Sequence, residues 1–398
     1  MYFKLIARDS VAIFNYMDSK KYNNTKLAIG ISKAIISFVL LYLFIALGYS
    51  LKMQNYIQTF TENSYLVFMI FVFAIGIFSS VLFMPINIYT GYYLEHKYNL
   101  SNQTFFKYFL ENLKSMLVGL VIGIPILLLF FFVINQFADL WWLVFAAAMF
   151  LVSVVLSQLF PILIMPIFYK VIPLRDEELK TRISNLAKGA GIKLENVFSF
   201  DMSKNTKKAN AAFTGLGKTK RIILGDTLLN DYSKDEIETV IAHELGHYKH
   251  KHIIKNLIFG TVSSFLTFFV ISILYKNSLS WFDFESITQI AALPLLSLWA
   301  MIIGLIQSPI GNILSRKYEY EADRYAIEST LKPESFINTL NKLTDQNLGD
   351  REPHPFIEWF FYSHPSIKNR INAIKIFVSE KGIVEITNTA PRTEFVNS

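Results

Sequence analysis

The pentapeptide His243-Glu244-Leu245-Gly246-His247 has the residue types and the spacing of a zinc site that could hydrolyse peptide bonds. Residues four apart lie on one face of a helix, so His243 and His247 can present two imidazoles to one metal ion. Glu244 follows the first histidine and can reach a water molecule on that ion, where it would act as general base. The pattern predicts zinc-dependent peptide hydrolysis.

A catalytic zinc needs a third protein ligand and one open coordination position. His250 and His252 follow the pentapeptide directly in a basic cluster. His250 shares the helix face of His243, but a third ligand so far along the same helix would stretch past a tetrahedral site. A ligand from another segment is therefore favoured.

The run from Ser315 to Asp323 is the better source of that ligand, because it follows an apolar stretch and should be helical. Glu319 and Asp323 are four residues apart and share a face, whereas Glu321 points away. One of the first two can bind the metal while the other hydrogen-bonds a ligand imidazole. The alternative is an ordinary solvated acidic helix end.

The composition indicates that these residues belong to a membrane protein. Of 398 residues, 53% are hydrophobic and 17% are charged, and the mean hydropathy is +0.36. These values are too apolar for an ordinary soluble protein. The absence of cysteine excludes disulfides and thiolate zinc ligands. The net charge is +7, and the basic residues are distributed as expected for the loops of a membrane protein. We therefore expect the lipid bilayer and no nucleic acid as a partner.

Apolar runs of about 20 residues are long enough to cross a bilayer. Six are expected, at Ala28–Leu51, Tyr65–Tyr89, Ser115–Asn135, Leu140–Phe168, Asn256–Tyr275 and Ile287–Leu314. Pro161 and Pro166 predict a kink or break near the end of the fourth. The predicted fold is mainly α, a polytopic membrane protein with about six transmembrane helices.

The segments that connect these runs are alternately rich and poor in lysine and arginine. The loops after the first and fifth runs carry only Lys52 and Lys276, and the turn near Phe137 carries neither residue type. The intervening segments and both ends are rich in basic residues. Under the positive-inside rule, both termini and the zinc site lie on the cytoplasmic side.

The sequence pattern of residues 169–254 predicts a small zincin-like α+β catalytic region. Strands are expected at Val197–Phe200, Asn210–Thr214 and Arg221–Leu224, the last two joined through a hairpin at Gly215–Lys218. Ser233 followed by Glu236 predicts a capping box that opens the zinc helix. The chain then divides into a membrane region at 1–168, this catalytic region, two spans at 255–314 and a C-terminal helical region at 315–398 that completes the zinc site.

The segment Asn210-Ala211-Ala212 lies in the expected hairpin just before the zinc helix. Its small residues would let another backbone approach. We therefore expect an exposed edge strand that binds an extended peptide by main-chain hydrogen bonds, with the Asn210 side chain also holding the substrate backbone. The alternative is a purely structural hairpin.

Three ordered blocks resemble the integral-membrane zinc metalloproteases of the type I CAAX prenyl protease family. They are the pentapeptide, the run Ser315-Arg316-x-x-Glu319-Tyr320-x-Ala322-Asp323, and His364-Pro365-Ser366 with Arg370-Ile371. The segments Asn210–Phe213 and Tyr93–Ser101 are also similar to that family. The resemblance spans most of the chain.

The resemblance implies a set of site residues: His243, His247 and Glu319 as ligands of one zinc ion, Asp323 in support, and His364 and Arg370 near the scissile bond. His364 with Arg370 would then be the best nearby donors for the oxyanion. His354 also precedes a proline, but only His364 is followed at the right distance by Arg370.

The resemblance also implies a barrel of tilted helices around a water-filled chamber. Eukaryotic members carry an additional N-terminal span, and this chain ends without a Lys-rich retrieval signal. We therefore expect a prokaryotic member in the plasma or inner membrane, or the endoplasmic reticulum membrane for a eukaryotic one. The expected substrate is a peptide or protein, of the C-terminally prenylated class if the resemblance extends that far.

Three functions are therefore considered. The first is a CAAX-type membrane endopeptidase, and the second is a metalloprotease that clears misfolded membrane proteins. The third is a non-enzymatic transporter or channel with a structural metal. Six spans favour the first over the second, whose members have about four, and Glu244 beside both imidazoles argues against the third.

Overall fold

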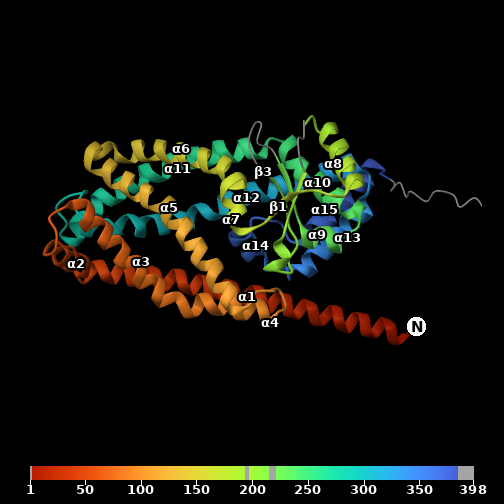
Figure 1. Cartoon of the computed structure of the whole chain (residues 1–398), viewed down its shortest axis with the longest axis horizontal. Helices are drawn as coiled ribbons and strands as arrows, with labels where there is room; N and C mark the ends of the chain where they lie inside the picture. The colour runs from red at the N-terminus through yellow and green to blue at the C-terminus, as the bar shows by residue number, and fades with distance from the viewer. Residues whose placement is uncertain (1, 193–196, 215–220, 384–398) are drawn as a thin grey trace, which may run out of the picture.

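The computed structural model describes residues 2–192, 197–214 and 221–383. A bundle of apolar helices and a smaller α+β region lie end to end along the long axis (Figure 1). Within the described residues, five helical stretches are long and apolar enough to cross a membrane: Met17–Ala46, Ser64–Lys97, Phe105–Phe168, His252–Phe282 and Ile290–Thr330.

The longest of these stretches holds two crossings. A straight helix of 64 residues would be about 96 Å long, whereas a bilayer core is about 30 Å thick. The stretch turns at Ala138, whose φ of 43° ends the first helix and separates it from the second. The predicted mainly α, polytopic membrane protein with about six spans is confirmed.

The membrane region is built from helices of very unequal length. They are α1 (Tyr2–Ala46), α2 (Tyr49–Gln58), α3 (Ser64–Ile88), α4 (Leu94–Lys97), α5 (Phe105–Phe137), α6 (Trp141–Leu159), α7 (Met165–Phe168), α11 (His252–Ser278) and α12 (Pro294–Thr330). The first predicted span reached too far, to Leu51. Its helix ends at Ala46 because Gly48 takes a left-handed conformation, with φ of 69°, before α2 begins.

The predicted break in the fourth span is present. A five-residue π-helical segment, Phe160–Ile164, separates α6 from α7 and contains Pro161. Proline cannot donate the hydrogen bond of a regular α-helix, so a local change of register at this point is expected.

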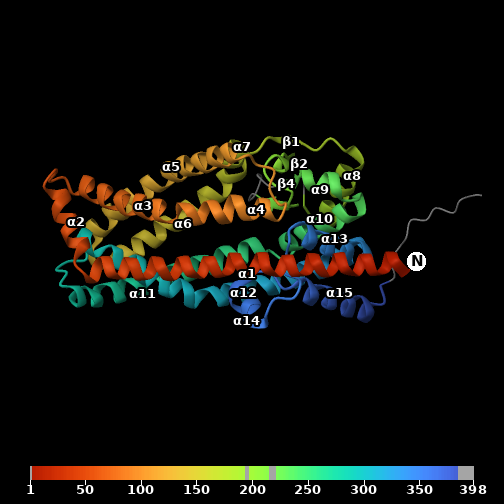
Figure 2. The same cartoon turned by 90° about the horizontal axis from the view of Figure 1, so that it is seen from below.

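The turns at the far end of the bundle are tied together. Lys276, at the end of α11, forms a 2.8 Å ion pair with Asp139 in the turn between α5 and α6. The Gln54 side chain of α2 accepts a 2.7 Å hydrogen bond from the backbone N–H of Ala291, just before α12. These turns lie opposite the α+β region, and Figure 2 shows α1 running the length of the molecule between the two ends.

The α+β region contains one mixed sheet within the described residues. Its strands are β1 (Val171–Pro173), β2 (Val197–Phe200), β3 (Ala211–Thr214) and β4 (Arg221–Gly225), in the order β1-β2-β4-β3. β4 is parallel to β2 and antiparallel to β3. The three predicted strands are confirmed, whereas β1 was missed because it has three residues and ends in proline. The predicted turn at Gly215–Lys218 lies outside the described residues.

Helices pack on this sheet and on one another and complete the region. They are α8 (Glu177–Gly189), α9 (Asp226–Asp231), α10 (Lys234–Lys249), α13 (Pro333–Gln346), α14 (Pro355–Phe361) and α15 (Ile367–Lys381). α12 enters the region from the membrane without interruption, so the sixth span and the acidic run that follows it form one helix.

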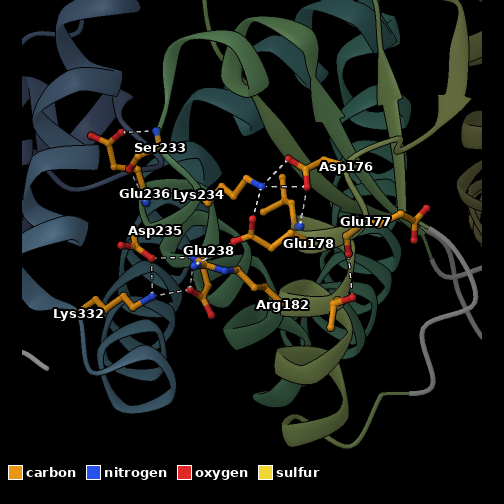
Figure 3. Close-up of polar contacts among 12 residues, drawn as sticks. Asp176, Glu177, Glu178, Arg182, Ser233, Lys234, Asp235, Glu236, Glu238 and Lys332 are labelled. Atoms are coloured by element: carbon orange, nitrogen blue, oxygen red, sulfur yellow. Dashed lines mark hydrogen bonds and ion pairs between the residues drawn. The ribbon is translucent and has the colours of Figure 1, made fainter. Parts of the chain in front are cut away.

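The start of α10 is fixed by local capping and by ion pairs. The Ser233 hydroxyl accepts from the Glu236 N–H, and the Glu236 carboxylate accepts from the Ser233 N–H, which confirms the predicted capping box. Figure 3 shows charged side chains that join α10 to α8 and to the turn before α13. Lys234 pairs with Asp176 at 3.0 Å and Glu178 at 2.6 Å, and Asp235 pairs with Arg182 and Lys332, each at 2.7 Å.

Candidate metal centre

The centre lies where α10 and α12 pack against each other. α10 brings His243 and His247, and α12 brings Glu319. The backbones approach closely because Gly246 of α10 presents no side chain to Ala322 of α12. Within the described residues, these two imidazoles and this carboxylate are the group that could hold a metal ion.

The spacing of the three donor atoms fits a tetrahedral zinc site. The Nε2 atoms of His243 and His247 lie 3.2 Å apart. They lie 3.5 and 3.3 Å from the Glu319 carboxylate oxygens Oε2 and Oε1 respectively. Ligands at about 2.0–2.2 Å from a tetrahedral ion are about 3.3–3.6 Å from one another. The imidazoles face different oxygens of the carboxylate, and one donor atom from each residue lies within 4.8 Å of the others, so the group is close to the size of such a site.

Asp323 supports the first imidazole from behind. Its Oδ1 lies 2.9 Å from the His243 Nδ1, which orients the ring and leaves Nε2 for a metal. Burial opposes a proton on His243, but hydrogen bonds to Asp323 and Glu319 raise the pKa of its imidazole to about 9. A proton therefore competes with a metal for this side chain.

Arg370 of α15 binds the same carboxylate from the other side. Its Nε donates to Asp323 Oδ2 at 2.9 Å and its Nη2 to Asp323 Oδ1 at 2.5 Å, and its Nη1 lies 3.5 Å from Glu319. Burial opposes the guanidinium charge, but attraction to Asp323 keeps the pKa of Arg370 above its ordinary value. The guanidinium group of Arg370 therefore interacts with the carboxylates of both Asp323 and Glu319.

A cleft of about 430 Å³ opens beside two of the three donor residues, His243 and Glu319. His243, Glu244, Glu319 and His364 line it, together with Asn210 and Ala211 from the start of β3. Phe336 and other apolar side chains also line it. The cleft therefore combines two residues of the metal group, an acid or base and the start of a strand.

His364 reaches the cleft from the loop between α14 and α15. Its Nδ1 lies 3.1 Å from Glu319 Oε2, and its side chain is 65% exposed. The rival His354 instead caps α14, where its Nδ1 accepts a 3.2 Å hydrogen bond from the Phe356 N–H. The two histidines, which both precede a proline, therefore have different roles in the structure.

Arg316 anchors the loop that carries His364, and sequence reasoning gave it no role. Its guanidinium, on α12, donates to the backbone carbonyls of Glu358 at 2.9 Å and Tyr362 at 2.6 Å. These carbonyls lie in and just after α14, whose C-terminal carbonyls have no helical partner. An arginine three residues before Glu319 was the only sequence signal available.

β3 lies at the edge of the sheet, next to β4 on one side. The Asn210 carbonyl accepts from the Gly225 N–H at 2.9 Å, and Ala212 pairs in register with Ile223. Because backbone groups alternate along an antiparallel strand, the N–H and C=O of Ala211 face away from β4. That is the arrangement which strand addition requires.

Asn347 fixes the approach to this edge strand and was also missed. Its side chain accepts from the Ala209 N–H at 2.9 Å and donates to the Ala209 carbonyl at 3.2 Å. The two residues are 138 positions apart, so no local pattern could have paired them.

The cluster after the pentapeptide does not supply the third ligand. His250 ends α10 as an exposed residue, and His252 is buried behind His247. Glu321 points away from Glu319, as its spacing predicted, and lies 2.9 Å from His252.

Two family models together match most of the chain. The model of peptidase family M48 matches residues 173–377. The model described as the CAAX prenyl protease N-terminal domain, with five membrane helices, matches residues 7–170. The boundary between them falls at the start of the α+β region.

Named relatives are similar over most of their length. A protein named uncharacterized metalloprotease YhfN, from Bacillus subtilis, is 31% identical over 89% of this chain and 84% of its own. CAAX prenyl protease 1 of Saccharomyces cerevisiae is 34% identical over 76% of this chain and 70% of its own. The crystal structure of S. mikatae Ste24p matches with a TM-score of 0.81 at 28% identity, covering 90% of this chain and 89% of that one.

Proposed function

The chain belongs to peptidase family M48, with the membrane domain of the CAAX prenyl proteases, and from this premise we propose that it cleaves peptides near a prenylated C-terminal cysteine. It is a multi-pass membrane zinc metallopeptidase, so the proposal concerns its substrate and the roles of its residues. The name of the yeast relative, CAAX prenyl protease 1, supports the substrate class. A transporter with a structural metal does not fit this membership.

One observation carries the proposal: two residues of the metal group, His243 and Glu319, line the same cleft as the start of the edge strand. An extended peptide that pairs with Ala211 would place its backbone along the cleft that also holds Glu244 and His364. We propose that the main chain of Ala211 binds that backbone, because its N–H and C=O face away from β4. The side chain of Asn210 would also hold the substrate, and Ala212, whose main chain pairs with β4, would lie beside it. Asn210 and Ala212 are exposed.

His243, His247 and Glu319 would hold the zinc ion, which supplies a Lewis acid to the scissile carbonyl and lowers the pKa of a water molecule. Glu244 would take the proton from the attacking water and deliver it to the leaving amine nitrogen.

His364 would donate a hydrogen bond from its imidazole to the developing oxyanion, since its side chain is exposed in the cleft. Arg370 is bound to Asp323 and touches Glu319, so we assign it to holding these two carboxylates in place. Asp323 would in turn orient His243.

The proposed location is the plasma or inner membrane, with the metal centre on the cytoplasmic side. The loops near Lys52 and Lys276 are poor in basic residues, and they lie at the end of the bundle opposite α10. The positive-inside rule then directs α10 to the cytoplasm.

The substrate proposal is tested with a farnesylated peptide ending in a CAAX sequence and its unmodified twin. We expect cleavage of the farnesylated peptide at a markedly higher kcat/KM. The variant Glu244→Gln should keep zinc and lose nearly all turnover, because the water would lack its base. Equal cleavage of both peptides would contradict a prenyl requirement and favour general clearance of membrane proteins.

The metal proposal is tested separately by elemental analysis. We expect one zinc per purified wild-type chain and a large loss in His243→Ala, which removes one of the three donors. Normal zinc content in that variant would contradict the assignment, as would a structure with Asp323 bound to zinc in place of Glu319.

A further inference from the structure

A buried histidine outside the metal group lies directly behind one of its members. His252, the first residue of α11, is 2% exposed. Its Nδ1 lies 2.9 Å from the Nδ1 of His247, and its Nε2 lies 2.9 Å from the Oε2 of Glu321. The ring of Tyr318 stacks on it, with centroids 4.1 Å apart. Glu321, His252 and His247 thus form a continuous chain that ends at the metal-binding nitrogen.

The carboxylate at the start of this chain decides which nitrogen carries each proton. An ionised carboxylate only accepts, so the Nε2 of His252 donates to Glu321. The Nδ1 of a neutral His252 is then an acceptor, and the Nδ1 of His247 must donate to it. His247 therefore keeps the lone pair on Nε2, the atom 3.3 Å from Glu319.

A hydrogen bond donated in the opposite direction, from His252 to His247, would prevent His247 from binding the metal. If both nitrogens of His252 carried protons, the Nδ1 of His247 would have to accept the hydrogen bond. A neutral His247 would then carry its proton on Nε2, where zinc needs a lone pair.

We propose that His252 and Glu321 are positioning residues that hold His247 in the tautomer and ring orientation that zinc requires. Asp323 does this for His243 by direct contact, whereas Glu321 acts through an intervening imidazole. Both carboxylates belong to α12, so one helix supplies a ligand and orients both imidazole ligands. The proposal rests on the zinc site proposed above and does not depend on the substrate.

Glu321 has other charged neighbours, but their contacts are weaker. Lys255 lies 3.8 Å and Lys317 lies 4.0 Å from its oxygens, and these lysine side chains are 46% and 70% exposed. Exposed pairs at such distances contribute little. The partly buried 2.9 Å contact with His252 is therefore the one that defines the role of Glu321.

The test measures zinc affinity of the purified full chain by competition with a chelator. His252→Phe keeps an aromatic ring against Tyr318 but removes the acceptor, and zinc affinity should fall by about 10–100-fold. His250→Ala is the matched control, because this exposed imidazole stacks near His252 at 5.6 Å, and its affinity should equal that of the wild type. The melting temperature of the zinc-free protein separates loss of folding from loss of positioning.

A double variant makes the test specific to the chain of contacts. Glu321→Gln should weaken zinc binding less than His252→Phe, because an amide oxygen can still accept. The variant combining both should bind zinc no more weakly than His252→Phe alone, since Glu321 acts only through His252. Unchanged affinity in Glu321→Gln and His252→Phe, or additive losses in the double variant, would overturn the proposal. Zinc binding is read without a substrate, so failure of the prenyl proposal would leave this result intact.

Discussion

Gly246 and Ala322 meet at the crossing of α10 and α12. A Cβ atom added at Gly246 would lie 2.9 Å from the Ala322 Cα and 3.1 Å from its carbonyl oxygen. Real Cβ atoms do not approach backbone this closely, so the crossing requires glycine at this position. The same crossing sets the distance between the two imidazoles of α10 and the carboxylate of Glu319.

Gly246→Ala should therefore weaken the metal site from a position that supplies no donor atom. The helices must separate to admit the methyl group, at a cost of about 1–3 kcal/mol. We expect a lower melting temperature and weaker zinc affinity. Gly260→Ala, on α11, is the control, because a Cβ there meets nothing within 4 Å. Wild-type zinc affinity in Gly246→Ala would show that the crossing tolerates a side chain.

His364→Ala should lower kcat by about 10²–10³-fold, the usual cost of one oxyanion donor. Zinc content should remain close to that of the wild type, because His364 is not one of the three donors. His354→Ala is the matched variant, since this histidine caps α14 and does not line the cleft. Equal effects of the two substitutions on kcat would remove His364 from the oxyanion role.

Ala211→Pro should raise KM while zinc content stays normal. The substitution removes the one N–H of β3 that faces away from β4 between Asn210 and Ala212. Ala212→Pro should instead lower the melting temperature, because Ala212 pairs with Ile223 inside the sheet. If Ala211→Pro folds and shows wild-type KM and kcat, the substrate does not pair with this strand.

The sequence was sufficient to predict features that depend on residues close together in the chain. Hydropathy found the spans, helical spacing found the imidazole pair at His243 and His247, and the Ser233–Glu236 capping box followed from its own four residues. Each of these depends on neighbours within a few turns of helix. Errors arose at span ends, as at Gly48, where backbone conformation and not hydropathy ends the helix.

Contacts across long separations that belong to no recognised motif had no signal in the sequence. Spacing showed that Glu321 points away from Glu319, but nothing local showed that it would meet His252, 69 residues earlier. The same is true of Asn347 at the edge strand and of the carbonyls that Arg316 binds. Such contacts require the packing of α10, α11 and α12 to be known.

Acid should weaken the ion pairs at the start of α10 (Figure 3). The hydrogen bond from Lys332 holds the pKa of Asp235 below its ordinary value, against the effect of burial. A lowered pKa in the folded state means that Asp235 stabilises the fold above about pH 3.9, its value in an unfolded chain, and loses this contribution as the pH falls further.

Asp235→Asn should therefore lower the melting temperature at pH 7, and its difference from the wild type should shrink towards pH 3. The effect should be about 1 kcal/mol or less, because the Asp235 side chain is 51% exposed. Glu177→Gln is the control, since that carboxylate is 76% exposed and lies 3.4 Å from Lys180. A difference that persists undiminished at pH 3 would mean that Asp235 acts through something other than its charge.

The orientation in the membrane can be tested by single cysteines, because the natural chain has none. Cysteine at Lys52, Phe137 or Lys276 should react with a membrane-impermeant maleimide in intact cells, since these residues lie in or next to the turns opposite the metal centre. Cysteine at Lys188, an exposed residue of α8, should react only after the membrane is permeabilised. The unsubstituted chain sets the background. Labelling at position 188 in intact cells would place the metal centre outside the cytoplasm and reverse the topology that the basic residues predict.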